Sequence, residues 1–135
     1  MVNEITAVPE EESVKQADYI YIVSDNGLII SMTAELDHHL ADEMREVIDE
    51  VIEKRGVNNV IFDFSKIGFM DSAGIGLIMG RYKKVNGKGE IYITGAGDSI
   101  KRILLISGLH KLVVDCVDVN EAVWRIKQGK EGVSL

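Results

Sequence analysis

The chain has 135 residues, which is enough for one domain with a single core and leaves no room for a second domain. Its formal net charge of −7 and pI near 4.9 argue against nucleic-acid binding, because no basic stripe is available to neutralise phosphates. A lone cysteine, Cys116, excludes an internal disulfide, and no apolar run approaches the roughly 18 residues of a membrane span. We therefore expect a cytoplasmic protein that binds neither nucleic acid nor membrane.

The start of the chain differs in composition from the rest. Residues 1–17 are polar and acidic, and they include Pro9, the only proline. We expect these residues to form a flexible or loosely docked arm, and residues 18–135 to form a single folded domain.

Two β-branched and apolar runs open this domain, at residues 19–23 and 28–33. Asp25-Asn26-Gly27 separates them and supplies the residues with positive φ that a tight hairpin needs. The pattern predicts an antiparallel pair of strands at the edge of a sheet.

The clearest helix follows this hairpin. Asp37 is its expected N-cap, Asp42 and Glu43 are expected in its first turn, and Gly56 is expected to end it in the left-handed conformation. Apolar residues recur at three- and four-residue spacing and predict one buried face: Leu40, Met44, Val47, Ile48, Val51 and Ile52.

The middle of the chain places a serine at the junction of a loop and a helix. A short buried strand is predicted at residues 57–64, and apolar residues at helical spacing begin at Ile75. Ser72 therefore lies near a helix N-terminus, where unpaired N–H groups and the helix dipole favour an anion by roughly 0.3–1 kcal/mol. Two interpretations stay open here. Ser72 accepts a reversible phosphoryl group, or Asp71 or Ser72 is simply the N-cap.

The rest of the chain continues the alternation of strands and helices. The predicted elements are a strand at 91–93, a helix capped by Asp98 or Ser99 and ended by Gly108, a strand at 112–114 and a helix at 121–128. The order ββαβαβαβα predicts an α/β fold in which helical crossovers connect the strands. We expect a mixed sheet of about five strands, with an N-terminal antiparallel hairpin, covered by about four helices.

Asp37-His38-His39 is similar to a metal motif of some phosphoesterases. Adjacent residues at the start of a helix point about 100° apart, however, and only His110 remains to complete a site. We therefore expect no metal.

Ser72 does not match a hydrolase nucleophile, because the Gly-x-Ser-x-Gly elbow would need glycine where Met70 stands. The glycines at 74, 76 and 80 depart from the dinucleotide-binding spacing, since the third is one residue late. We expect no catalytic residue and no cofactor. Three glycines in a helix instead indicate that the sheet beneath or a partner above approaches the backbone closely. Arg81, Lys83 and Lys84 are interpreted as a solvated face.

Four segments in the same order resemble the STAS-domain anti-sigma factor antagonists of Gram-positive bacteria, in particular the sporulation type that acts on anti-sigma-F. They are Glu35-Leu36-Asp37-His38-His39, the run from Phe69 to Gly76, Gly80-Arg81-Tyr82-Lys83 and Ser107-Gly108-Leu109. The resemblance covers most of residues 30 to 116. The sequence departs from it at Ala73, where a second serine is usual, and at Ala34, where glycine is usual.

The resemblance implies a STAS-type domain that is not an enzyme. Ser72 would be phosphorylated by an anti-sigma factor that is also a serine kinase, and a serine phosphatase would remove the phosphate. Without the phosphate, the domain would bind the anti-sigma factor and release its sigma factor, which activates transcription. A monomer is implied when no partner is bound. The implied partner-binding residues are Asp37, His38, Asp71, Gly74, Ile75 and Gly76.

Two alternatives remain open after the resemblance. One is a STAS regulator of a stress-response or transporter-linked pathway, with Ser72 serving a different kinase. The other is a STAS sensor of a nucleotide or another small ligand. The His38-His39 pair and the segment 80–83 favour the sporulation type.

Overall fold

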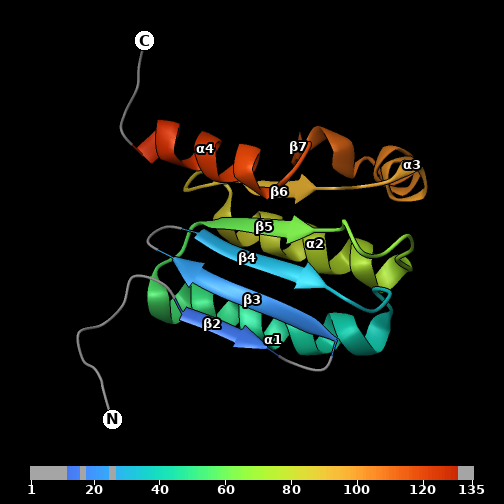
Figure 1. Ribbon diagram of the computed structural model, residues 1–135, viewed down its shortest axis with the longest axis horizontal. Coiled ribbons are helices and arrows are strands. Elements are labelled where there is room, and N and C mark those ends of the chain that lie inside the picture. Colours follow the sequence, from blue (N-terminus) through green and yellow to red (C-terminus); the bar gives the residue numbers. More distant parts are fainter. Residues whose placement is uncertain (1–11, 16–17, 25–26, 131–135) are drawn as a thin grey trace.

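A computed structural model describes residues 12–15, 18–24 and 27–130 of the chain (Figure 1). Its sheet has six strands in the order β2-β3-β4-β5-β6-β7. The bounds of the strands are β2 Glu12–Lys15, β3 Tyr19–Ser24, β4 Gly27–Met32, β5 Asn59–Asp63, β6 Ile91–Thr94 and β7 Val114–Cys116. The pairs β2–β3 and β3–β4 are antiparallel, and the other three pairs are parallel. The predicted mixed sheet with an N-terminal hairpin is confirmed.

One strand comes from a segment that the sequence did not predict to be ordered. Residues Glu12–Lys15 pair with β3 in the register Ser13↔Ile22 and Val14↔Tyr21. These four residues are therefore docked on the sheet and not mobile, because β3 presents an open edge whose backbone groups a short polar segment can satisfy. The rest of the expected arm, residues 1–11 and 16–17, lies outside the described residues.

Four helices accompany the sheet, as expected, together with a short 3-10 helix. Their bounds are α1 His38–Arg55, α2 Ser72–Val85, α3 Asp98–Ser107, η1 Leu109–Lys111 and α4 Val119–Lys130. No helix in the described ranges is long and apolar enough to span a membrane.

The helix ends test the predicted caps. Asp37 caps α1 and Gly56 ends it with φ 67°, as expected. Asp42 and Glu43 lie beyond the first turn, which contains no acidic residue. The N-cap of α3 is Gly97 rather than Asp98 or Ser99, and no side-chain hydrogen bond caps this helix.

The last strand begins two residues later than predicted. Residues Leu109–Lys111 form η1, with Leu112 N–H donating to the Leu109 carbonyl at 2.8 Å. This extra turn moves the strand to Val114–Cys116, and α4 then extends beyond the predicted residues 121–128 at both ends.

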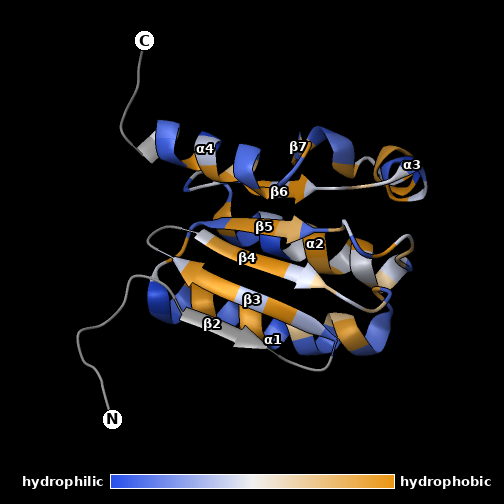
Figure 2. Cartoon of the chain, viewed as in Figure 1, coloured by the Kyte–Doolittle hydropathy of each residue, from blue (hydrophilic) through white to orange (hydrophobic). Residues whose placement is uncertain are grey.

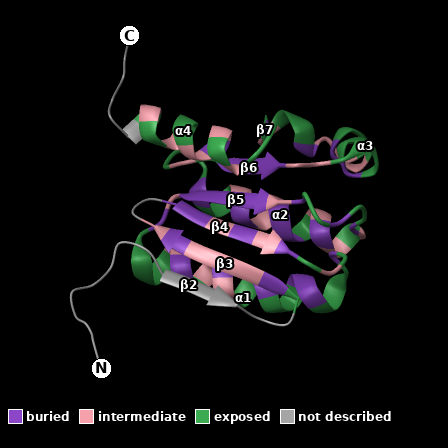
Figure 3. Cartoon of the chain, viewed as in Figure 1, coloured by how far each residue is buried: buried purple, intermediate pink, exposed green. Residues whose placement is uncertain are grey.

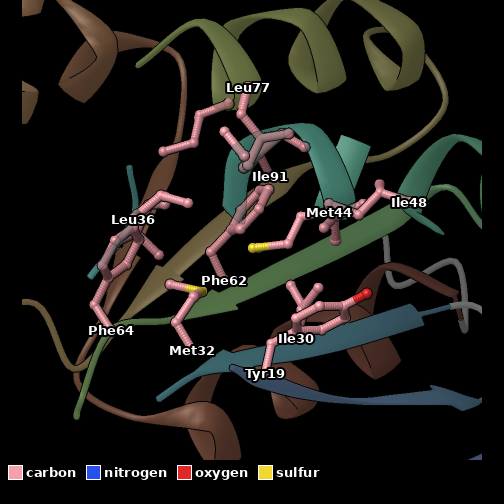
Figure 4. Packing of buried hydrophobic residues seen from close by; sticks show 14 of the residues in the cluster. Tyr19, Ile30, Met32, Leu36, Met44, Ile48, Phe62, Phe64, Leu77 and Ile91 are labelled. Atoms are coloured by element: carbon pink, nitrogen blue, oxygen red, sulfur yellow. The ribbon is translucent and has the colours of Figure 1, made fainter. Parts of the chain in front are cut away.

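Alternation along the strands divides the core between the two faces of the sheet. On β5, Val60 and Phe62 face the large cluster beneath α1, α2 and α3, while Ile61 faces the smaller cluster beneath α4. Figure 4 shows side chains of the large cluster converging from the strands and helices: Tyr19, Ile30, Met32, Phe62 and Phe64 lie with Leu36, Met44, Ile48 and Leu77. Apolar and buried residues accordingly coincide along the central strands (Figures 2 and 3).

Candidate functional site

The segments that lead into α1 and α2 lie side by side at the carboxyl ends of β4 and β5, and backbone hydrogen bonds connect them. Leu36 and Met70 form a parallel β-bridge. Leu36 N–H donates to the Phe69 carbonyl at 3.2 Å, and Asp71 N–H donates to the Leu36 carbonyl at 3.1 Å. Both helices therefore begin beside the carboxyl ends of β4 and β5, on the right in Figure 1.

An aspartate caps each of these helices. Asp37 Oδ1 accepts a hydrogen bond from Leu40 N–H at 3.0 Å, and Asp71 Oδ1 accepts one from Ala73 N–H at 2.8 Å. The bond from Leu40 N–H is the main reason why the pKa of Asp37 is lowered, and the neighbouring His39 and His38 contribute further. The two carboxylates thus lie on residues that directly follow the bridged pair of Leu36 and Met70.

This arrangement leaves Ser72 at the surface. Because Asp71 is the N-cap of α2, Ser72 is the first helical residue and is exposed. Its hydroxyl lies where the first backbone N–H groups and the positive end of the helix dipole favour an anion. The capping role therefore belongs to Asp71, and phosphorylation of the exposed Ser72 stays a prediction.

The helix glycines have different surroundings. A Cβ added to Gly74 would lie 3.0 Å from Met70 Cβ and 3.1 Å from Leu36 Cδ2, so glycine permits this helix to pack closely on the bridge. A Cβ added to Gly76 or Gly80 would meet no atom within 4 Å. The close approach predicted for these glycines is thus found beneath Gly74, while the space beside Gly76 and Gly80 is open.

The predicted partner-binding residues are gathered around the starts of α1 and α2, but not all of them reach the surface. Asp37, His38 and Gly76 are exposed, and Asp71 and Ile75 are half-buried. Gly74 is buried. Its missing side chain lets α2 pack closely on Met70 and Leu36, and its role as a contact residue stays a prediction.

The metal interpretation receives no support from the geometry. The rings of His38 and His39 lie with centroids 4.0 Å apart and both side chains are exposed. Among the described residues, no three His, Cys, Asp or Glu side chains are grouped closely enough to hold a metal ion.

Arg81 differs from the expectation of a solvated face. Its residue exposure is 6%, and its Nε lies 3.0 Å from Asp49 Oδ1 on α1. A signal was available in the sequence, because Arg81 shares a helix face with the buried residues Leu77, Ile78 and Val85. Lys83 and Lys84 are exposed, as expected.

Sequence reasoning also missed two features. Phe69, three residues before Ser72, is 48% exposed although it is a large apolar side chain. A cleft of about 600 Å³ lies where β5 and β6 begin and is lined by Asn59, Glu90, Trp124 and Arg125 among others. Because Ser72 follows the other end of β5, this cleft is not part of the Ser72 site.

Comparisons with known proteins converge on one family. The family model described as the STAS domain matches residues 19–123. An anti-sigma F factor antagonist of Paenibacillus polymyxa is 39% identical over 87 residues, which cover 64% of this chain and 74% of the relative.

Solved structures are similar over nearly the whole chain. The structure of the anti-sigma factor antagonist SpoIIAA in its unphosphorylated form aligns with a TM-score of 0.71 and 25% identity, covering 93% of this chain and 99% of that one. The Bacillus cell fate determinant SpoIIAA in its phosphorylated form aligns with a TM-score of 0.64 and 26% identity, covering 86% and 98%.

Proposed function

The chain belongs to the STAS domain family, and from this membership and the geometry of the site we propose that it is an anti-sigma factor antagonist switched by phosphorylation of Ser72. The observation that carries the proposal is the position of Ser72. It is an exposed first residue of α2, and the adjacent N-cap Asp71 is hydrogen-bonded to the bridge that also leads into α1. The relatives supply the class of partner, since both the Paenibacillus protein and SpoIIAA are described as anti-sigma factor antagonists.

In the unphosphorylated state the surface around Ser72 docks on the anti-sigma factor and displaces its sigma factor. The docking residues are the exposed or half-buried members of the implied set: Asp37, His38, Asp71, Ile75 and Gly76. The protein acts by binding and is not an enzyme, and it works in the cytoplasm as a monomer.

Phosphorylation opposes this docking through charge and hydration. A phosphoryl group adds about −1.5 to −2 charges at neutral pH, and its oxygens are strongly hydrated. In the middle of a docking surface it costs desolvation free energy, and the carboxylates of Asp37 and Asp71 add like-charge repulsion. A loss of about 3 kcal/mol weakens binding more than a hundredfold.

The partner that adds the phosphate is the anti-sigma factor itself, acting as a serine kinase, and a separate serine phosphatase removes it. The reversible phosphorylation in this proposal is supported by SpoIIAA, which is known in both an unphosphorylated and a phosphorylated form. It also requires no refolding, because the phosphate is added to an exposed residue at a helix N-terminus that tolerates an anion.

The experiment that tests the proposal is intact mass spectrometry after incubation with ATP and the host's anti-sigma kinase. Wild type should gain one phosphate and Ser72→Ala should gain none. Ser99→Ala is the matched control, because Ser99 is also an exposed serine in the first turn of a helix. A phosphate on Ser72→Ala, or none on wild type with an active kinase, would contradict the proposal.

A further inference from the structure

Phe69 combines exposure with a fixed position. Five large apolar side chains of the described residues are exposed: Phe69 at 48%, Leu105 at 60%, Ile106 at 78%, Val117 at 80% and Trp124 at 60%. Among these, only Phe69 lies in the segment that carries Ser72. Its neighbours Met70 and Ile67 are buried, which shows that this loop packs its other apolar side chains inward.

Backbone hydrogen bonds fix the segment that carries the Phe69 ring. The Phe69 carbonyl accepts a hydrogen bond from Leu36 N–H at 3.2 Å, and two residues later Asp71 N–H donates to the Leu36 carbonyl at 3.1 Å. Met70, between them, is 2% exposed and fixed in the core. An exposed aromatic residue on a backbone that is already ordered costs little further conformational entropy when a partner covers it.

The surroundings of Phe69 match the anatomy of a protein interface. Aromatic residues are enriched at the centres of such interfaces, and a polar, solvated rim surrounds them. The Leu36–Met70 bridge leads directly into Asp37 and Asp71, and Ser72 follows, so charged and hydroxyl groups adjoin the segment of the ring. Trp124, by contrast, lies on α4 and is far from Ser72 in the sequence.

We infer that Phe69 is an aromatic anchor of the Ser72 surface and inserts into an apolar pocket of the anti-sigma factor. The inference rests on the proposed function, and it adds a contact residue that the family resemblance did not assign. The ring contributes binding energy, whereas the chemistry takes place at the Ser72 hydroxyl. Phe69 therefore affects how tightly the kinase holds this protein and not how fast the bound hydroxyl reacts.

Phe69→Ala separates these two effects. With the host's purified anti-sigma kinase, the dissociation constant of the unphosphorylated protein should rise at least about tenfold, as for a truncated interface anchor. The KM for phosphorylation of Ser72 should rise in parallel while kcat stays the same, because uniform binding energy is lost. Phe69→Leu, which keeps an apolar side chain, should restore part of the affinity.

Trp124→Ala is the matched control, since it also removes an exposed aromatic ring and lies outside the Ser72 segment. Circular dichroism and thermal unfolding of both variants show whether they fold. Folded Phe69→Ala with the affinity and KM of Trp124→Ala would overturn the inference alone. Failure of the wild type to bind the kinase or accept its phosphate would overturn the proposed function, and the inference with it.

Discussion

Arg81 on α2 and Asp49 on α1 form an ion pair inside the seam between the two helices, with Nε and Oδ1 3.0 Å apart. The side chains are 8% and 25% exposed. Among the described residues neither atom has a hydrogen-bond partner, so their contact has ion-pair distance without hydrogen-bond orientation. Burial lowers the pKa of Arg81, and the charge of Asp49 partly opposes this effect. The pair joins the two helices whose first residues form the candidate site.

Removing one partner of this pair should destabilise the fold strongly. In Asp49→Asn the Arg81 guanidinium stays buried without a countercharge, and a broken buried pair typically costs about 3–5 kcal/mol. We expect the free energy of unfolding to fall by about 3 kcal/mol, the lower end of this range, because the Asp49 side chain is still 25% exposed to solvent. Urea unfolding at neutral pH measures the change.

Two variants define the control for this prediction. Glu53→Gln breaks the exposed pair with Lys84, whose side chains are 63% and 35% exposed, and should cost less than about 1 kcal/mol. The double variant Asp49→Leu/Arg81→Met removes both charges and should recover most of the loss. If Asp49→Asn costs no more than Glu53→Gln, the pair does not stabilise the seam between the helices.

Gly76→Ala should improve folding and impair binding at the same time. Glycine in a helix costs about 0.8–1 kcal/mol relative to alanine, and the added methyl group at Gly76 would meet no atom within 4 Å. The free energy of unfolding should therefore rise by up to about 1 kcal/mol. The same methyl group lies on the proposed docking surface, one helical turn beyond Ser72, and should lower affinity for the anti-sigma factor.

The other helix glycines provide the comparison. Gly80→Ala should give a similar stabilisation with a smaller loss of affinity, since it lies a further turn from Ser72. Gly74→Ala should give no stabilisation, because its methyl group would lie 3.0 Å from Met70 Cβ. Chemical unfolding and calorimetric titration distinguish the three variants. Full affinity in Gly76→Ala would exclude this residue from the contact.

Asp37 should make stability depend on acid pH. Its folded-state pKa is lowered from the ordinary value of 3.8, first by the hydrogen bond from Leu40 N–H. A group with a lowered folded-state pKa stabilises the fold above its unfolded pKa, and this contribution is lost as the pH falls through the folded value. Wild type should therefore lose stability below about pH 3.8 relative to Asp37→Asn, in which a neutral cap remains.

Urea midpoints of both proteins between pH 7 and pH 2.5 measure this difference. Other carboxylates titrate in the same range in both proteins, so the informative quantity is the difference between the two curves. A constant difference over this range would show that the Asp37 carboxylate is not stabilised by its bond to Leu40 N–H.

Local chemistry allowed much of the fold and of the site to be predicted. Asp37 and Gly56 were recognised as the ends of α1 because capping depends on a side-chain oxygen and on a positive φ, which belong to single residues. The position of Ser72 at a helix start is predicted by the apolar residues at helical spacing that begin at Ile75. The partner-binding residues were carried over from a resemblance, and their contacts remain a prediction.

The features that sequence did not predict depend on tertiary contacts. Residues 12–15 become a strand because β3 offers an open edge, and their own composition does not indicate this. Arg81 has a charged side chain whose burial depends on Asp49, a residue of another helix. The exposure of Phe69 follows from the bridge between Leu36 and Met70, which turns Met70 inward.

Ser72→Asp should separate folding from binding. An acidic residue at the start of a helix is favoured by about 0.3–1 kcal/mol, so the free energy of unfolding should stay the same or rise slightly. Affinity for the anti-sigma factor should fall by at least about tenfold, because a desolvated carboxylate beside Asp37 and Asp71 costs more than 1.4 kcal/mol at a docking surface. Urea unfolding and calorimetric titration give the two values.

Ser99→Asp is the control for this last prediction, since it adds the same charge to the first turn of α3 at another exposed serine. It should fold normally and bind like the wild type, which shows that position and not net charge determines the loss. Ser72→Ala removes the hydroxyl without adding charge, so it should also keep binding. If Ser72→Asp binds as tightly as Ser72→Ala, charge at this position does not weaken docking, and a switch would have to act through the size or hydration of the phosphate.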